Sequence, residues 1–301
     1  EVESSEGNLV QSYKRKFINE ANHLRSLRHR NIVNVHDVFE ENNTVYYVMD
    51  FIEGTNLNSC VVNTPMDEIR ALSVWRVICE AVRYMHEQSM LHLDIKPKNI
   101  MLRSMDGTPV LIDFGMSKIF DENGRPEESS NIGLGTDGYA PLEQKDYAVN
   151  EDTITVTEAA RLNATQDGFQ KNIPVTMDIY ALGATLFKML SGVKELPSAS
   201  YVLVHGIPEK KLKERGVSRA TRRLVKKAMS PLKEDRYQSV DDMIRAIPKK
   251  SARKPPTPSP DPNPNRKWIY GAVAFVVAML AVMLLVRNHN TTTEVRMEGD
   301  D

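Results

Sequence analysis

Four polar side chains in two neighbouring stretches of the sequence could do chemistry together. Asp94, Lys96 and Asn99 lie close to one another in HLDIKPKN, and Asp113 follows in VLIDFG. Transfer of a phosphoryl group needs a carboxylate to orient the attacking hydroxyl, a cation over the developing charge and oxygen ligands for a divalent metal. Asp94 can accept the hydroxyl proton, and Lys96 can meet the transferred phosphate. Asn99 and Asp113 can bind the metal, and such hard oxygen ligands favour Mg²⁺.

A plainer interpretation of the same residues has to be weighed beside this one. Asp94, Asn99 and Asp113 could simply form turns, since Asp and Asn side chains bond to their own backbone there. His92 beside apolar residues is more often a core histidine than a catalyst, and we assign it a structural role. Whether the catalytic interpretation holds depends on what else the chain contains in the right order.

Hydrophobic periodicity predicts the elements that must position these side chains. An amphipathic helix is expected at 14–29, a hairpin follows it, and a helix with one apolar face spans 67–87. The helix at 178–192 is apolar almost all round and should be central, with Thr176 or Asp178 as its N-cap and Gly192 at its end. The remaining expected elements are strands 32–39 and 44–52, a turn at 105–108, and amphipathic helices at 209–229 and 239–247.

Composition restricts the function classes. The chain has 301 residues, of which 41% are hydrophobic and 26% charged, so it can bury an ordinary core. A formal net charge of −1 gives no general attraction for nucleic acid, and we expect no nucleic-acid partner. Cys60 and Cys79 lack the spacing of a disulfide framework or a zinc site, which favours a reducing compartment.

The C-terminal part of the sequence indicates a membrane. Residues 268–286 form 19 consecutive positions without a charge, long enough for a helix that crosses a bilayer. Basic residues are more frequent before this segment than after it, which predicts a cytoplasmic location for everything upstream. We therefore expect a single-pass membrane protein with a basic, proline-rich linker at 249–267 and a short external tail at 287–301.

Further motifs decide between the interpretations, because together they resemble the protein kinase superfamily, in particular the bacterial serine/threonine kinases with one membrane span. HLDIKPKN, DFG and the APLE of GTDGYAPLEQ occur in the kinase order. The resemblance implies an α+β, bilobal fold with an incomplete small lobe at 1–53 and an intact, mainly helical large lobe at 54–248. It also implies ATP and Mg²⁺ as cofactors and proteins as substrates.

The resemblance assigns roles to individual residues. Asp94 would be the catalytic base, and Lys96 with Thr136 is a pattern of serine/threonine kinases rather than tyrosine kinases. Glu143 and Arg236 would form a structural ion pair. Residues matched to nucleotide binding are Met49 at the back of the adenine pocket, the backbone of Asp50 and Ile52, Glu20, and the metal ligands Asn99 and Asp113. Residues matched to structural positions are Leu24, His92 and Phe114 in an apolar spine, and Asp178 at the start of the central helix.

Two features depart from the family pattern. The glycine-rich loop and the strand lysine that would pair with Glu20 are absent from the sequence, and Lys14 and Lys16 lie on the same predicted helix as Glu20. We therefore expect a truncated fragment that binds ATP poorly. The second departure is Leu93, which replaces the arginine before the catalytic aspartate, so we expect weak control by phosphorylation of Ser129, Ser130 or Thr136.

Two segments have open interpretations. Residues 145–177 are either a solvated insertion or a docking or autophosphorylation segment that uses Thr153, Thr155 or Thr157. The basic run at 209–227 is either a solvated helix face or a surface that contacts anionic lipid headgroups.

The sequence thus predicts a serine/threonine protein kinase at the cytoplasmic face of a membrane, with self-association possible. The alternative is a catalytically silent pseudokinase that acts as a membrane-tethered binding module. A small-molecule phosphotransferase would not explain GTDGYAPLEQ or Arg236.

Overall fold

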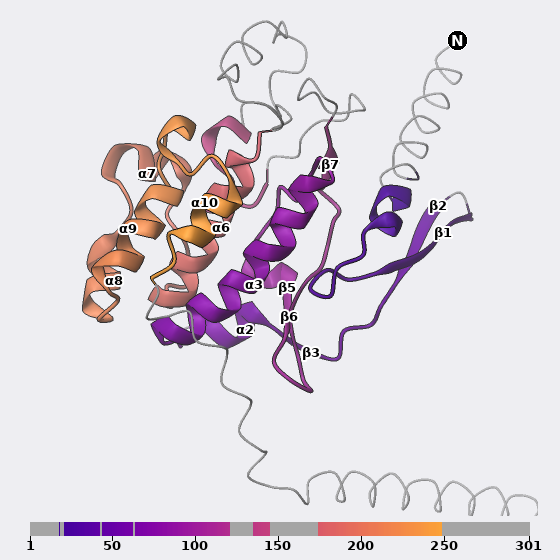
Figure 1. Ribbon diagram of the computed structural model, residues 1–301, viewed down its shortest axis with the longest axis horizontal. Coiled ribbons are helices and arrows are strands. Elements are labelled where there is room, and N and C mark those ends of the chain that lie inside the picture. Colours follow the sequence, from indigo (N-terminus) through magenta and orange to yellow (C-terminus); the bar gives the residue numbers. More distant parts are fainter. Residues whose placement is uncertain are drawn as a thin grey trace, which may run out of the picture. The chain divides into compact units, whose positions relative to one another are not determined.

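Short antiparallel strands and a larger group of helices make up the described chain (Figure 1). The computed structural model describes residue 18 and residues 21–42, 44–62, 64–120, 135–144 and 174–248. Contacts divide the chain into two units, Glu1–Pro255 and Pro256–Asp301, and every described residue belongs to the first. The division into lobes at residue 54 stays a prediction.

A helical turn and a hairpin open the described chain. Residues 21–26 are helical, so the predicted helix at 14–29 ends earlier than expected, and most of its first half lies outside the described residues. The strands β1 (Val35–Glu41) and β2 (Thr44–Met49) pair antiparallel, with Glu41 opposite Thr44. The predicted hairpin is therefore confirmed, although its first strand begins at Val35 rather than at residue 32.

A three-stranded antiparallel sheet carries the chemically interesting stretch. Its order is β3-β5-β6, and a separate pair, β4-β7, closes the loop beside it. Asn99 comes directly before β5 and Asp113 two residues after β6, so the β5–β6 hairpin brings both side chains to one end. The bounds are β3 (Gly54–Asn56), β4 (Met90–Leu91), β5 (Ile100–Arg103), β6 (Pro109–Leu111) and β7 (Lys118–Ile119).

Helix α3 (Glu68–Glu87), which follows the short α2 (Leu57–Val61), agrees with the predicted helix at 67–87. The side chain of Asp67 caps it by accepting a hydrogen bond from the Arg70 N–H at 2.9 Å. On its apolar face the fully buried Trp75 donates from Nε1 to the carbonyl of Leu182 at 2.9 Å. This bond ties α3 to the next long helix.

Helix α6 (Thr176–Ser191) is buried along its whole length, as its sequence predicted. Gly192 ends it with φ 66°, a left-handed backbone that glycine adopts without strain. The expectation that Thr176 or Asp178 caps its start is wrong. The N-cap is Val175, whose side chain has no polar atom, and the carboxylate of Asp178 is used elsewhere.

Four shorter helices complete the described chain, namely α7 (Ala199–His205), α8 (Glu209–Glu214), α9 (Arg219–Ala228) and α10 (Val240–Arg245). The basic stretch at 209–229 is two helices rather than one, because the chain turns at Gly216 with φ 71°. Ser218 then caps α9. Helix α7 has no counterpart among the predicted elements.

The α+β fold class is confirmed, whereas the predicted span at 268–286, the linker, the tail and most of the 145–177 segment lie outside the described residues. Within residues 18–248 as far as they are described, no helix has the length and hydropathy that a membrane crossing requires.

Close packing of α6 against α9 leads to a first prediction. A Cβ added at Gly183 would lie 2.6 Å from the Cβ of Ala228 and 3.0 Å from a side-chain carbon of Met229. Gly183→Ala should therefore lower the free energy of unfolding by about 1–3 kcal/mol despite the better helix propensity of alanine. Urea denaturation measures the change. Ala228→Gly should recover part of the loss in the Gly183→Ala background, and strictly additive effects would contradict the contact.

Candidate active site

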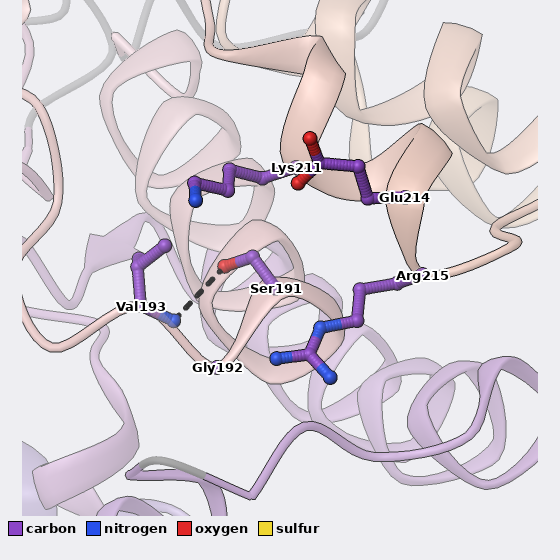
Figure 2. A pocket seen from close by; sticks show the side chains of 6 residues that line it. All are labelled: Ser191, Gly192, Val193, Lys211, Glu214 and Arg215. Carbon is purple, nitrogen blue, oxygen red and sulfur yellow. Dashed lines mark hydrogen bonds between the residues drawn. The ribbon is translucent and has the colours of Figure 1, made fainter.

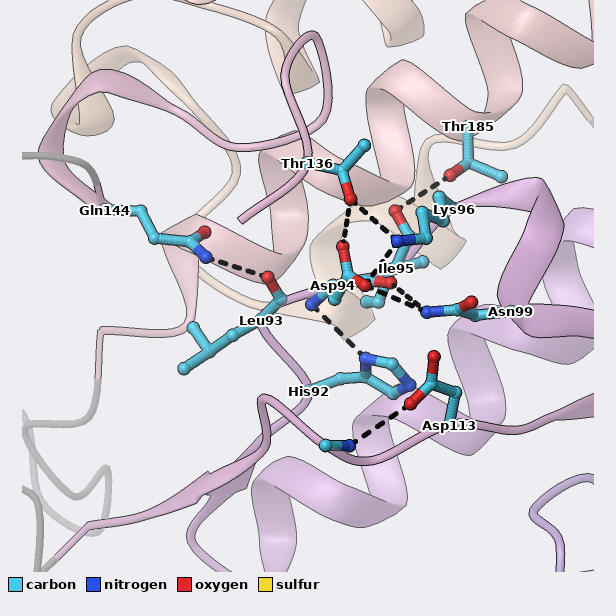
Figure 3. A network of polar contacts seen from close by, with 11 residues as sticks. His92, Leu93, Asp94, Ile95, Lys96, Asn99, Asp113, Thr136, Gln144 and Thr185 are labelled. Carbon is cyan, nitrogen blue, oxygen red and sulfur yellow. Dashed lines mark hydrogen bonds and ion pairs between the residues drawn. The ribbon is translucent and has the colours of Figure 1, made fainter. Parts of the chain in front are cut away.

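Asp94 and Lys96, in the loop between β4 and β5, form a closed triangle of polar contacts with Thr136 from residues 135–144 (Figure 3). The ammonium of Lys96 lies 2.5 Å from Oδ2 of Asp94 and 2.7 Å from Oγ1 of Thr136. The hydroxyl of Thr136 donates to Oδ1 of Asp94 at 2.6 Å. The structure thus brings together three residues that the sequence analysis selected from two motifs, HLDIKPKN and GTDGYAPLEQ, and holds a buried carboxylate beside a cation.

Asn99 completes this arrangement from the short 3-10 turn Pro97–Asn99. Its amide nitrogen donates to the carbonyl of Asp94 at 3.0 Å and to Oδ2 of the same residue at 3.1 Å. Because the nitrogen is used in this way, the side-chain oxygen faces away from Asp94 and is free to bind a cation.

Asp113 lies beside this group because the N–H of Ile112 donates to the carbonyl of Asn99 at 2.9 Å. Asp113 itself has φ 62°, which is uncommon for a residue with a side chain. No group of three or more His, Cys, Asp and Glu side chains that could hold a metal occurs among the described residues. One carboxylate and one amide oxygen fit Mg²⁺, which binds few protein ligands and takes the rest from water and nucleotide phosphates.

The buried carboxylate of Asp178 holds the loop from behind. Its two oxygens accept hydrogen bonds from the N–H groups of His92 at 2.9 Å and Leu93 at 2.8 Å. Nε2 of His86, near the end of α3, lies 2.9 Å from the same carboxylate. Leu93 has φ 62°, and these bonds fix it in that strained conformation. The structural role predicted for Asp178 is therefore that of a loop anchor and not of a helix cap.

The pKa of Asp178 and the pKa of His92 both lie below their ordinary values, for different reasons. Complete burial by itself raises the pKa of Asp178, but the bonds from His86 and the loop amides outweigh it, and the pKa lies below its ordinary value. Burial lowers the pKa of His92, against the opposing effect of the Asp178 charge. His92 is thus neutral, and its ring packs on Phe114 with 5.2 Å between the centroids, which fits its predicted structural role.

Two further contacts fix the segment that carries Thr136. Arg236, almost fully buried, forms a two-pronged pair with Glu143, in which Nη2 donates to Oε2 at 3.1 Å and Nη1 to Oε1. The same guanidinium donates to the carbonyl of Thr176 at 3.0 Å. The predicted pair between Glu143 and Arg236 is present, and it links residues 135–144 to the start of α6.

The residues predicted to contact the nucleotide lie on and after β2. Ile52 is buried, whereas Met49 is 45% exposed. The carboxylate of Asp50 pairs with Asn34 and His36, and its N–H donates to the carbonyl of Asn34 at 3.0 Å. Of the two backbone groups of Asp50, the carbonyl is therefore the one that remains for an adenine. Adenine contacts here stay a prediction.

Some predicted residues lie outside the described chain or were assigned by position alone. The residues that are not among those described are Glu20, Ser129, Ser130, Thr153, Thr155 and Thr157. Leu24 and Phe114 are buried, as spine positions would be, and nothing tests that assignment further.

Sequence reasoning missed two contributors to the site. His86 supports Asp178 from α3, and Gln144 donates from Nε2 to the carbonyl of Leu93 at 2.8 Å. Gln144 directly follows the APLE motif, but no spacing rule links it to the loop. His86 lies in a helix whose periodicity reports only the apolar face, so no signal in the sequence identifies it.

Comparisons with known proteins bear on this arrangement. A family model described as the protein kinase domain matches residues 3–154. Serine/threonine-protein kinase PknD of Protochlamydia amoebophila is 27% identical over 256 residues, which cover 78% of this chain and 25% of the relative. Serine/threonine-protein kinase PrkC of Bacillus subtilis is 29% identical over 238 residues, which cover 76% of this chain and 32% of the relative.

A vertebrate relative and a solved structure agree with these matches. Myosin light chain kinase 3 of Danio rerio is 32% identical over 132 residues, covering 43% of this chain and 18% of the relative. The solved chain described as the PpkA-294 apo form superposes with a TM-score of 0.58 at 26% identity, covering 79% of this chain and 75% of that one. This chain spans about a third or less of these curated relatives.

The anchoring role of Asp178 leads to a second prediction. Asn at this position keeps the size of the side chain, but its amide group would face one of the N–H donors of His92 and Leu93 instead of accepting from it. The substitution also removes the buried negative charge that His86 contacts. Asp178→Asn should lower the free energy of unfolding by about 3 kcal/mol. Chemical denaturation tests this, with Asp241→Asn as the control that removes a half-exposed carboxylate. Equal, small effects of both substitutions would exclude an anchoring role.

The depressed pKa of His92 leads to a third prediction. The unfolded chain binds a proton near pH 6.5 that the native state binds only at lower pH, so this contribution to stability is complete above pH 6.5 and is lost as pH falls below it. The lowered pKa of Asp178 makes stability depend on pH only below 3.8, its ordinary value, which lies outside the pH range in which His92 contributes. His92→Phe should therefore reduce the loss of unfolding free energy between pH 6.5 and about pH 5. A pH dependence unchanged by the substitution would refute this origin.

Proposed function

The chain belongs to the protein kinase family, and we propose that it is a serine/threonine protein kinase that transfers the γ-phosphate of ATP to protein hydroxyls with Mg²⁺. The single observation that carries the proposal is the triangle of Asp94, Lys96 and Thr136, because it places a carboxylate, a cation and a hydroxyl within hydrogen-bond distance of one another. Asn99 and Asp113 would hold Mg²⁺ beside it, and the metal would screen the phosphate charge.

Each residue has a separate task in this reaction. Asp94 orients the hydroxyl of the incoming substrate and takes its proton. Lys96 is bound to that carboxylate and faces the transferred phosphate, where its charge stabilises the transition state more than the ground state. Thr136 holds both groups at fixed distance, which is the positioning that phosphoryl transfer mainly requires.

The alternative function is a pseudokinase that binds partners without catalysis. It would be favoured if the complete gene lacked the glycine-rich loop and the strand lysine that kinases use. Retention of both metal-binding side chains favours the kinase, since a scaffold has no need for them. The proposal also places the domain at the cytoplasmic face of a membrane, through residues 268–286. Resistance of the upstream part to external protease in intact cells would support that placement.

The test, made on the protein expressed from its complete gene, is transfer of labelled phosphate from ATP to a generic protein substrate with Mg²⁺ present. Asp94→Asn should lower the rate about 100-fold or more, because the amide cannot accept the proton. Nucleotide binding measured by calorimetry on the same proteins separates the candidates. If ATP bound but no transfer occurred, and Asp94→Asn changed nothing, the pseudokinase would be favoured.

Thr136 provides a fourth prediction with a matched pair of variants. Thr136→Ser keeps the hydroxyl between Lys96 and Asp94 and should retain most of the transfer rate. Thr136→Val keeps the shape but leaves the buried Asp94 and the partly buried Lys96 without this partner, so the rate should fall about tenfold. Steady-state rates at saturating ATP give the comparison. Equal rates for the two variants would mean that the hydroxyl has no positioning role.

A further inference from the structure

Helices α8 and α9 carry a concentration of positive charge that phosphoryl transfer does not use. The segment 209–228 contains nine basic and two acidic residues, although the whole chain has a formal net charge of −1. A basic run of this kind is usually a solvated helix face. The structure shows how these charges are arranged and which of them have partners.

The apolar side of α9 is already buried. Leu224, Val225 and Ala228 are in the core, and α9 packs on α6. Arg219, Arg223 and Lys226 follow one another at helical spacing on the opposite side and are exposed. The helix therefore presents cations to solvent and keeps no apolar stripe for insertion into another structure.

Some of the basic residues on these helices are neutralised locally. Glu209 lies 3.0 Å from Nε of Arg222 and 3.7 Å from Nζ of Lys213, and Glu214 lies 3.9 Å from Nζ of Lys210. Lys227 lies over the ring of Tyr237 at 4.7 Å. Five exposed cations form no ion pair within 4.0 Å in the described part of the chain, although Lys226 is near enough to Glu209 to help lower the pKa of that carboxyl. We call them the basic face: Lys211, Arg215, Arg219, Arg223 and Lys226.

A hollow of about 400 Å³ adjoins the basic face, between α8 and the end of α6. Figure 2 shows Lys211 of α8 above Ser191 and Val193, and Arg215, the residue that ends α8, extending toward Gly192 from the other side. The carbonyls of Val193 and Lys194 follow α6 directly. Both accept hydrogen bonds from the ammonium of Lys188, at 2.7 Å for Lys194, and this positive charge offsets the repulsion that the two carbonyl oxygens would exert on an anion. Glu214 is the one acidic residue that lines the hollow.

We propose that the basic face docks on an anionic lipid bilayer and that the hollow receives the phosphate of one headgroup. The cations of the basic face are all exposed, on α8, on the residue that ends it and on α9, and a bilayer is an extended anionic surface that attracts such groups together. Since the apolar side of α9 is in the core, the attraction rests on charge alone and is weakened by salt. The inference does not depend on phosphoryl transfer or on the predicted span.

The experiment uses the full chain with bilayer discs of phosphatidylcholine, either alone or mixed with phosphatidylserine. The rate of acetylation of Lys226 is read by mass spectrometry, which reports this face even if another segment inserts. We expect acetylation about fivefold slower on the anionic discs, with the difference lost at high salt. Equal rates on both kinds of disc, or a slowing that salt does not reverse, would overturn the proposal.

Matched variants separate the basic face from net charge. Lys211→Glu with Arg215→Glu should abolish the slowing at Lys226, whereas Arg25→Glu with Arg30→Glu, two exposed sites outside α8 and α9, should leave it intact. Thermal unfolding checks that both pairs fold. The Asp94→Asn variant should behave like the unaltered chain. If inositol hexakisphosphate or an acidic protein protected Lys226 while anionic discs did not, the face would be a site for a soluble anion and the lipid proposal would be wrong.

Discussion

The contact on which the active-site geometry depends most is the one between the buried carboxylate of Asp178 and the amides of His92 and Leu93. A left-handed backbone at a leucine costs about 1–2 kcal/mol, so the loop would relax without an opposing interaction. Two charge-assisted hydrogen bonds outweigh that cost. The position of Asp178 in the first turn of α6 helps, because a helix N-terminus favours a negative charge.

Helix α6, which carries Asp178, also fixes the positions of other segments around the candidate site. Helix α6 is buried from end to end and forms hydrogen bonds with three other segments. It accepts from Trp75 at the Leu182 carbonyl and from Arg236 at the Thr176 carbonyl, and its Thr185 hydroxyl donates to the Ile95 carbonyl. A buried polar group without a partner is costly, so each of these bonds fixes one neighbouring segment relative to α6. The loop between β4 and β5 and the segment with Thr136 are therefore both held in place by the same helix, α6.

The residues that meet at the candidate site could be predicted from the sequence more completely than the scaffold that holds them. Asp94, Lys96, Asn99 and Asp113 were found because their order and spacing are specific to one reaction. The anchoring of Asp178 was misjudged, because periodicity places a residue on a helix but not the direction in which its side chain bonds. The break between α8 and α9 was missed for a related reason, since charges dominate that stretch and only Gly216 marks the turn.

Leu93 shows how this loop is held without the arginine that its position usually carries in similar sequences. Its side chain is buried against Leu91, Phe120 and Met177, so it anchors the loop by apolar contacts instead of presenting a charge to solvent. Its carbonyl accepts from Gln144, and its N–H donates to Asp178. The loop is therefore held at Leu93 by apolar packing, an amide and a carboxylate, and not by a cation that a phosphate could bind. Weak control by phosphorylation stays a prediction.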